Sequence, residues 1–158
     1  MAQRILDAPF GPLVVTTTDV GVREIWFGRD ARVDVGDVGS AAAAHIDRAE
    51  VELREYLAGQ RTVFEVPLDR TSRTGFRGEV LDALEQVRFG ETVTYGELAD
   101  RTGRPKASRA VGTAMATNPI AIIVPCHRVL PSTGGVGNYA GTPAVKEFLL
   151  RLEGVALD

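Results

Sequence analysis

The sequence is poor in the residues that hold small secreted or metal-dependent proteins together. Its 158 residues include one cysteine, Cys126, and two histidines, His45 and His127. A single cysteine cannot form an internal disulfide bond, which fits a reducing compartment, and these three residues cannot complete a closed structural zinc site. A chain of this length can bury about two-thirds of the surface that it exposes when unfolded. We therefore expect a fold that needs neither a metal nor a cofactor.

Long hydrophobic runs are absent as well. No apolar segment typical of a secretion signal follows residues 1–4, and no run approaches the roughly 18 residues that a membrane span requires. We therefore expect a cytoplasmic protein with no membrane attachment. The net charge of −3 argues against indiscriminate binding of polyanions.

The charged residues are distributed unevenly along the chain. Residues 1–68 contain seven Lys/Arg against eleven Asp/Glu, whereas residues 69–158 contain eleven against ten. The densest basic cluster lies between positions 101 and 109, where no acid is present: Arg101, Arg104, Lys106 and Arg109. A short basic cluster is usually a solvated surface. Whether this one binds a ligand depends on the helices or loops in which it lies.

The first part of the chain begins with a pattern of strands and turns. Turn sequences at 9–12 and 18–21 separate extended segments at 4–8, 13–17 and 22–27. This pattern predicts an antiparallel meander.

A helix and a further strand should follow the meander. Residues 28–39 are rich in Gly, Asp and Arg and read as a surface loop, after which Ser40 is the expected N-cap. Gly59 ends the predicted helix, whose apolar face is Ile46, Ala49, Leu53, Tyr56 and Leu57. Residues 64–68 read as a strand. We assign residues 1–68 to an N-terminal α/β domain, in which His45 is a surface or internally satisfied histidine.

A polar stretch at 69–75 is the predicted linker to a helical C-terminal domain at 76–158. Apolar spacing predicts a first helix with a core-facing stripe of Phe76, Val80, Leu84 and Val87. A capping-box sequence at Thr94 predicts a helix over 95–102, and a short turn separates it from a helix over 107–117. Two short helices joined in this way are typical of a helix-turn-helix.

The helix at 107–117 is unusual because most of its residues are small. Small side chains allow close approach to another surface, and the simplest interpretation is tight packing against a neighbouring helix. The basic cluster at its start favours another, in which the helix lies against a nucleic-acid backbone or enters a narrow groove. Further along, residues 132–138 predict a hairpin or wing-like loop. A last helix is expected between Thr142 and Glu153, with a buried stripe of Val145, Phe148, Leu149 and Leu152.

The only cysteine follows the apolar residues 122–125 and directly precedes His127. The apolar run reads as a buried extended segment that Pro125 stiffens. Free cysteine is usually a small buried hydrophobe, so a structural role for Cys126 stays open. For a chemical role the thiol must lose its proton, and His127 is the nearest base, either directly or through a water. Glu153 is the carboxylate that we would choose to orient this histidine.

Residues around the cysteine resemble the O6-alkylguanine-DNA alkyltransferase family, the methylated-DNA–protein-cysteine methyltransferases. The resemblance rests on Pro-Cys-His-Arg-Val at 125–129, and on Asn118-Pro119 and Arg109-Ala110-Val111-Gly112 before it. It extends over the second half of the chain, through Phe89-Gly90-Glu91-Thr92, Thr94-Tyr95, Gly137-Asn138-Tyr139 and Glu153-Gly154. The first half matches mainly in the order of its elements. The resemblance implies a ribonuclease-H-like α/β domain followed by a winged-helix-like domain that contains the helix-turn-helix.

The resemblance also implies a reaction. Cys126 would take the alkyl group from the O6 of a guanine flipped out of duplex DNA. Glu153, His127, a water and Cys126 would form a chain, and Tyr95 would supply the proton that the leaving guanine needs. Asn118 would tighten the turn before the cysteine. The thioether product is not hydrolysed as a thioester is, so the protein would act once.

The family further implies which residues touch DNA. Arg109 would enter the stack in place of the flipped base, and the helix at 107–117 would lie in the minor groove. The implied DNA contacts are Thr94, Tyr95, Ala107, Ser108, Arg109, Gly112 and Met115, and the implied substrate pocket is Pro125, Val129, Tyr139, Ala140 and Gly141. We expect a cytoplasmic monomer that associates with the nucleoid when it binds DNA. Cooperative binding to DNA and a minor activity on O4-alkylthymine are left open.

Two other functions fit the residues. A DNA-binding or damage-sensing module would use Cys126 only as a structural residue, although relatives that bind alkylated DNA without transfer carry another residue in its place. A thiol hydrolase would pair Cys126 with His127, but the sequence offers no evident oxyanion site. Two residues also have simpler interpretations. Arg109 could be a solvated arginine at the end of a helix, and Tyr95 could be an aromatic residue of the core.

Overall fold

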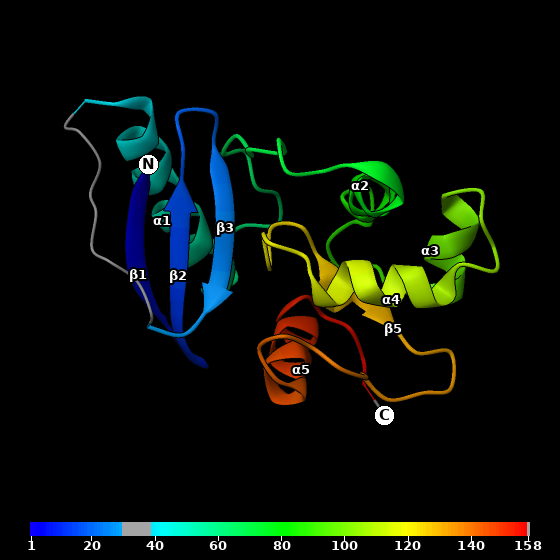
Figure 1. Ribbon diagram of the computed structural model, residues 1–158. Helices are drawn as coiled ribbons and strands as arrows, with labels where there is room; N and C mark the ends of the chain where they lie inside the picture. The colour runs from blue at the N-terminus through cyan, green and yellow to red at the C-terminus, as the bar shows by residue number, and fades with distance from the viewer. Residues whose placement is uncertain (30–38, 158) are drawn as a thin grey trace. The chain divides into compact units, whose positions relative to one another are not determined.

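The computed structural model describes residues 1–29 and 39–157, which divide into two compact units, Met1–Ser72 and Arg73–Asp158 (Figure 1). Most of the surface loop predicted at 28–39 therefore lies outside the described residues. Within the described ranges, no helix is both long enough and apolar enough to cross a membrane.

An antiparallel sheet and one helix form the first unit. Strands β1 (Ala2–Ala8), β2 (Gly11–Thr17) and β3 (Val22–Phe27) lie in the order β1-β2-β3, which confirms the predicted meander. Helix α1 (Ala41–Leu57) packs against all three strands (Figure 1). Ser40 is its N-cap, as predicted, because its side chain accepts a hydrogen bond from an amide of the first turn.

The predicted core face of α1 is buried, and its histidine is satisfied. Four of the predicted apolar residues, Ile46, Ala49, Leu53 and Tyr56, are buried, whereas Leu57 is partly exposed. The Nδ1 atom of His45 lies 3.0 Å from the carbonyl oxygen of Thr18. The prediction of an internally satisfied histidine is therefore confirmed.

The strand predicted at 64–68 is wrong. In the described part of the chain, this segment makes only an isolated parallel bridge between Leu68 and Val22. The amides of Glu65 and Val66 donate instead to the buried carboxylate of Glu52, at 2.8 and 3.0 Å. A side chain from α1 thus takes the donors that a sheet partner would need.

The start of the predicted linker is also part of the first unit. The amide of Asp69 donates to the carbonyl oxygen of Val22 at 2.8 Å. Its buried carboxylate accepts hydrogen bonds from the hydroxyls of Thr18 and Thr71, each at 2.6 Å. These contacts hold Asp69 against the end of β2 and the start of β3.

Helices dominate the second unit, whose elements are α2 (Gly75–Leu84), β4 (Val93–Thr94), α3 (Tyr95–Arg101), α4 (Ser108–Ala116), β5 (Val129–Leu130) and α5 (Pro143–Leu152). Helix α4 contacts both α2 and α3. Thr94 and Glu97 form both hydrogen bonds of the predicted capping box at the start of α3. The predicted pair of short helices is therefore present as α3 and α4.

The approach to the cysteine differs from the prediction. The segment is buried as expected, but it is a tight turn and not an extended strand: the amide of Val124 donates to the carbonyl oxygen of Ile120, and Ile122 has a φ of 73°. The side chain of Asn118 closes this turn, donating to Val124 O at 2.8 Å and accepting from Ile120 N at 3.1 Å. Cys126 then begins a single 3-10 turn, Cys126–Arg128.

The last helix begins as predicted but buries a different set of residues. Thr142 caps α5 by accepting from Val145 N at 3.3 Å, and Pro143 takes the first helical position. Val145 and Leu149 are buried as expected, whereas Phe148 and Leu152 are partly exposed. Lys146 and Leu150, which lie outside the predicted stripe, are buried in their place. Residues 132–138, predicted as a hairpin or wing-like loop, contain no strand and form a loop, and β5 before them pairs with β4 in parallel.

Gly21 lies so close to the backbone of Pro67 that a substitution there tests the packing of the first unit. A Cβ atom at this position would lie 2.2 Å from the carbonyl oxygen of Pro67, so the segment that follows α1 would have to move. We expect Gly21→Ala to lower the free energy of unfolding by about 1–3 kcal/mol. In urea unfolding, the control Gly112→Ala, which meets no atom within 4 Å, should be neutral or stabilising. Equal stability of the wild type and Gly21→Ala would contradict the packing described.

Candidate active site

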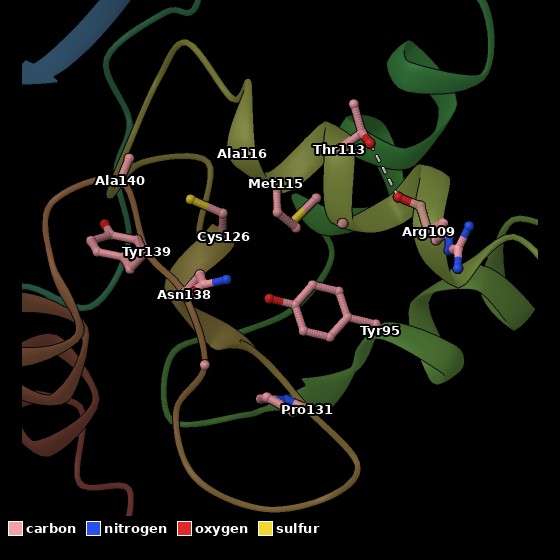
Figure 2. A pocket seen from close by; sticks show the side chains of 12 residues that line it. Tyr95, Arg109, Thr113, Met115, Ala116, Cys126, Pro131, Asn138, Tyr139 and Ala140 are labelled. Carbon is pink, nitrogen blue, oxygen red and sulfur yellow. Dashed lines mark hydrogen bonds between the residues drawn. The ribbon is translucent and has the colours of Figure 1, made fainter.

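A cavity of about 650 Å³ lies in the second unit, with Cys126 in its wall (Figure 2). Its wall is formed by α3, α4, the cysteine turn and the loop before α5. The lining residues are Tyr95, Arg109, Gly112, Thr113, Met115, Ala116, Cys126, Pro131, Gly137, Asn138, Tyr139 and Ala140. The only thiol of the chain thus faces a space large enough for a small organic group.

The thiol of Cys126 is held in a protected position. Only 6% of the residue is exposed, and this burial raises the pKa of the thiol. A hydrogen bond with the Asn118 side chain and the positive charge of Lys146 act in the opposite direction, favouring the thiolate. Because the net shift is upward, the resting thiol is protonated at neutral pH and needs a base in order to react.

The structure brings together His127 and Glu153, the pair that the sequence suggested. His127 Nε2 donates to Glu153 Oε2 at 2.8 Å, and neither side chain is exposed. Burial lowers the pKa of His127 and outweighs the effect of the neighbouring carboxylate. The imidazole is therefore neutral at pH 7, with its Nε2 proton on the side of Glu153.

The second ring nitrogen of this histidine is available to accept a proton. Nδ1 of His127 is buried and has no hydrogen-bond partner among the described residues. In the tautomer that Glu153 selects, Nδ1 carries a lone pair. No direct hydrogen bond joins His127 to Cys126 in the described part of the chain, so the water bridge remains a prediction.

Sequence reasoning missed the role of Arg128. Its Nε and Nη2 atoms donate to the two oxygens of Glu153 at 2.8 and 2.9 Å, and Nη1 donates to the carbonyl oxygen of Val87 at 2.6 Å. Burial opposes ionisation of Glu153, but the hydrogen bonds from His127 and Arg128 outweigh it and hold its pKa well below the usual range. Glu153 is therefore a fixed carboxylate, suited to orienting the histidine and poorly suited to accepting its proton.

Tyr95 and Asn118 also lie at the site. Tyr95 is the first residue of α3, and Figure 2 shows its hydroxyl pointing into the cavity near Asn138 and Met115. Burial and the neighbouring thiol raise the pKa of Tyr95, so the phenol keeps its proton at neutral pH. Asn118 does not line the cavity; it holds the turn that leads to Cys126.

The predicted DNA contacts fall into three groups. Arg109, Gly112 and Met115 line the cavity, and Figure 2 places Arg109 on the side away from Cys126. Thr94 and Ser108 line an adjacent cavity of about 390 Å³, together with Tyr95 and Arg109. Ala107 is the N-cap residue of α4 and lines neither cavity.

The predicted substrate pocket is only partly matched by the residues that line the cavity. Tyr139 and Ala140 line it, whereas Pro125, Val129 and Gly141 do not. Residues that sequence reasoning did not assign to the site, Thr113, Ala116, Pro131, Gly137 and Asn138, complete the wall. The structure shows why position 137 is a glycine, because it has a φ of 74° and a Cβ there would lie 2.8 Å from the Pro131 ring.

Comparison with known proteins decides the family. Residues 1–70 match the ribonuclease-like domain of 6-O-methylguanine DNA methyltransferase, and residues 75–155 match its DNA binding domain. The chain belongs to this methyltransferase family.

Several similar methyltransferases span nearly the whole chain. The methylated-DNA–protein-cysteine methyltransferase of Methanosarcina acetivorans is 41% identical, over 98% of this chain and 99% of its own. That of Mycobacterium tuberculosis is 40% identical, over 95% of this chain and 90% of its own. The crystal structure of Mycobacterium tuberculosis OGT in complex with DNA has a TM-score of 0.82 at 37% identity, and covers 97% of this chain and 92% of its own. The two-domain alkyltransferase fold, with a small N-terminal sheet and a helical C-terminal domain, is thus shown for this methyltransferase.

The Arg128–Glu153 pair predicts a specific pattern of stabilities. Glu153→Gln leaves a buried guanidinium without its carboxylate and should cost about 3–5 kcal/mol of unfolding free energy at pH 7. The double variant Arg128→Met/Glu153→Gln removes both charges and should recover much of this loss. The pKa of Glu153 is depressed in the folded protein. The extra unfolding free energy of the wild type over Glu153→Gln is therefore fully present above the pKa of an unfolded glutamate, about 4.3. It is lost as the pH falls toward the pKa of Glu153 in the folded protein. Urea unfolding between pH 7 and pH 3 measures both effects, and additive losses in the double variant would refute the coupling.

Proposed function

We propose that the protein repairs O6-alkylguanine in duplex DNA by moving the alkyl group irreversibly onto Cys126. The observation that carries this proposal is the position of the only cysteine, in the wall of a cavity and next to a buried histidine that Glu153 and Arg128 orient. The family membership supports the same reaction, since its curated members are named methylated-DNA–protein-cysteine methyltransferases.

The transfer is one displacement whose atoms balance. The thiol proton passes through a water to Nδ1 of His127, and the sulfur then forms a bond to the alkyl carbon. The bond between that carbon and O6 breaks, and the guanine keeps its electron pair. Tyr95 donates a proton to the leaving guanine and regains one from solvent, and the imidazolium of His127 releases its extra proton to solvent. A thioether and an unmodified guanine result, without any metal or cofactor.

The charges around His127 favour this direction of proton movement. The imidazole is neutral, so its Nδ1 lone pair is free to take the thiol proton. Glu153 stays ionised beside Arg128 and stabilises the imidazolium that forms. The thioether is not cleaved by water under these conditions, so each molecule reacts once.

We infer that α3 and α4 bring the alkylated base to the cavity from the minor groove. Among the described residues, no ion pair neutralises Arg104, Lys106 or Arg109, so their charges can act on phosphates and on the base stack. The guanidinium of Arg104 lies 4.8 Å from the centre of the Phe76 ring. Arg109 lines the cavity opposite Cys126, which suits a side chain that fills the place of a flipped base. The small residues of α4 permit its close approach to the groove.

The same proposal assigns a fold and a role to each part of the chain. We assign DNA binding and transfer to residues 76–158, with a winged-helix-like arrangement, and a ribonuclease-H-like topology to residues 1–68, joined by the stretch 69–75. The match to a ribonuclease-like family domain supports the latter assignment. We further propose a cytoplasmic, nucleoid-associated monomer, in which cooperative DNA binding and a minor activity on O4-alkylthymine are open to direct assay.

The decisive test is chemical. Incubation with duplex that contains O6-methylguanine should add one methyl group to the peptide that carries Cys126, as measured by mass spectrometry of a digest. Cys126→Ser should bind the same duplex and remain unmodified. An unmodified wild-type peptide after complete binding would refute the transfer and favour a damage-sensing role.

The proposed role of Arg109 is tested by comparing two substrates. Arg109→Ala should slow transfer from O6-methylguanine duplex by about tenfold to a hundredfold, because flipping costs a few kcal/mol of unstacking. Reaction with free O6-benzylguanine, which needs no flipping, should be nearly unchanged. Arg88→Ala, which removes an exposed arginine outside the cavity wall, is the control for nonspecific charge effects. Equal losses on both substrates would contradict the flipping role.

A further inference from the structure

Helix α4 depends on contacts from other elements for its order. It has nine residues, Ser108–Ala116, and its N-cap residue, Ala107, has no side chain that can cap the first turn. Helices of this length are marginal on their own in water, and alanine is a poor N-cap. The first turn nevertheless carries Arg109, the residue that we assign to the base stack. The contacts that hold α4 therefore determine where Arg109 lies.

Arg77, a residue of α2, binds the other end of this helix. Its Nε donates to the hydroxyl of Thr117 at 3.0 Å, and its Nη2 donates to the carbonyl oxygen of Thr117. Thr117 is the C-cap residue of α4, whose own last turn contains no basic residue. The last carbonyl groups of a helix lack partners within it and carry partial negative charge, so a cation there is stabilising. Arg77 supplies from α2 the cation that α4 lacks.

Two threonine hydroxyls continue this contact along α4. The hydroxyl of Thr117 donates to the carbonyl oxygen of Thr113 at 2.8 Å, and the hydroxyl of Thr113 donates to that of Arg109 at 3.2 Å (Figure 2). Residues four positions apart lie on the same face of a helix, so these hydrogen bonds form one row from Arg77 to Arg109. Bonds of this kind adjust the local bend of a helix. The row therefore connects the first turn of α4 to the contact at Arg77.

The first turn of α2 also contacts the chain before α4. The ring of Phe76, the neighbour of Arg77, lies under the guanidinium of Arg104. Arg104 belongs to the turn between α3 and α4, and its attraction to the ring face holds that turn to α2. Two consecutive residues of α2 thus contact the chain on both sides of α4.

Thr117 is also the point at which α4 leads into the cysteine turn. Asn118 follows it directly and closes that turn through hydrogen bonds of its own. The residues of this turn are mostly buried, whereas Arg109, Thr113 and Thr117 are exposed. We therefore expect the loss of Arg77 to displace α4 more than it displaces the thiol.

We propose that Arg77 is a positioning residue for base flipping: through Thr117 and Thr113 it holds α4 at the place from which Arg109 reaches the base stack. This inference rests on the proposed function, because flipping is a step of that reaction. It assigns to Arg77 no contact with DNA, with the alkyl group or with Cys126.

A small set of variants separates this role from a structural one. Arg77→Met removes the donors and keeps a long side chain, whereas Arg77→Lys keeps a cation. Thr113→Val interrupts the row and nearly keeps the shape of the side chain. Arg88→Met removes an exposed arginine from the segment after α2 and is the matched control.

Four quantities would be measured for each protein. They are the affinity for O6-methylguanine duplex, the rate of methyl transfer at saturating duplex, the rate of reaction with free O6-benzylguanine, and the amide hydrogen exchange of the peptide that covers residues 108–117. The exchange measurement needs no DNA and no transfer, so it reports on α4 alone.

The expected results differ among the variants. Arg77→Met should slow transfer at saturating duplex by about threefold to tenfold, the effect of losing exposed hydrogen bonds from a charged group. Its affinity for duplex and its reaction with free O6-benzylguanine should be nearly unchanged, while residues 108–117 should exchange faster. Thr113→Val should change the rate and the exchange in the same directions. Arg77→Lys should recover part of the rate, and Arg88→Met should match the wild type.

A double variant shows whether Arg77 acts through Arg109. In an Arg109→Ala background, Arg77→Met should cause little further loss of transfer from duplex, because the side chain that it positions is already gone. Losses that multiply in the double variant would show independent roles and would overturn the proposal.

Other outcomes would overturn it as well. A folded Arg77→Met protein with the wild-type transfer rate would show that the contact is not needed. A weaker affinity with an unchanged saturating rate would make Arg77 a phosphate contact. Equal losses on duplex and on free O6-benzylguanine, or failure of both Arg77 variants to fold, would assign Arg77 a structural role. Absence of methyl transfer in the wild type, by contrast, would refute the proposed function, while the exchange of residues 108–117 would still report whether Arg77 holds α4.

Discussion

The bidentate pair between Arg128 and Glu153 is the interaction on which the geometry of the site depends. It holds the carboxylate in one place and keeps it ionised, and the carboxylate in turn selects the tautomer and the orientation of His127. Arg128 also binds the carbonyl oxygen of Val87, so the pair joins the cysteine turn to the end of α5 and to the segment after α2. A buried ion pair of this kind adds little net stability, but it costs much to break, which favours a single arrangement of Glu153 and His127.

Near this pair, the fold buries the thiol of Cys126 and keeps it in the protonated form. Burial raises the pKa of Cys126, whereas the positive charge of Lys146 lowers it. His127 is neutral and can therefore accept a proton. The turn that Asn118 closes, with Ile122 in a left-handed conformation, sets the position of the thiol at the cavity wall. Strain at an isoleucine of this kind persists only where the surrounding contacts determine the backbone, as they do here.

The parts of the fold that could be predicted from the sequence are set by contacts between residues that lie close together in the sequence. The caps at Ser40, Thr94 and Thr142 and the meander of the first unit are of this kind. The strand expected at 64–68 and the extended approach to the cysteine were wrong, because distant side chains, Glu52 and Asn118, take the backbone groups of those segments. Lys146 and Arg128 were missed at the site for the same reason, since one sequence does not show which charged residues are buried.

The central claim is that Cys126 accepts one alkyl group and is then spent. It is tested most directly by titrating the protein with a large excess of O6-methylguanine duplex and counting the methyl groups that leave the DNA. The account predicts that the count rises to about one per protein molecule and stops. A count that continues to rise with time would show that the thiol is regenerated, and would contradict the account.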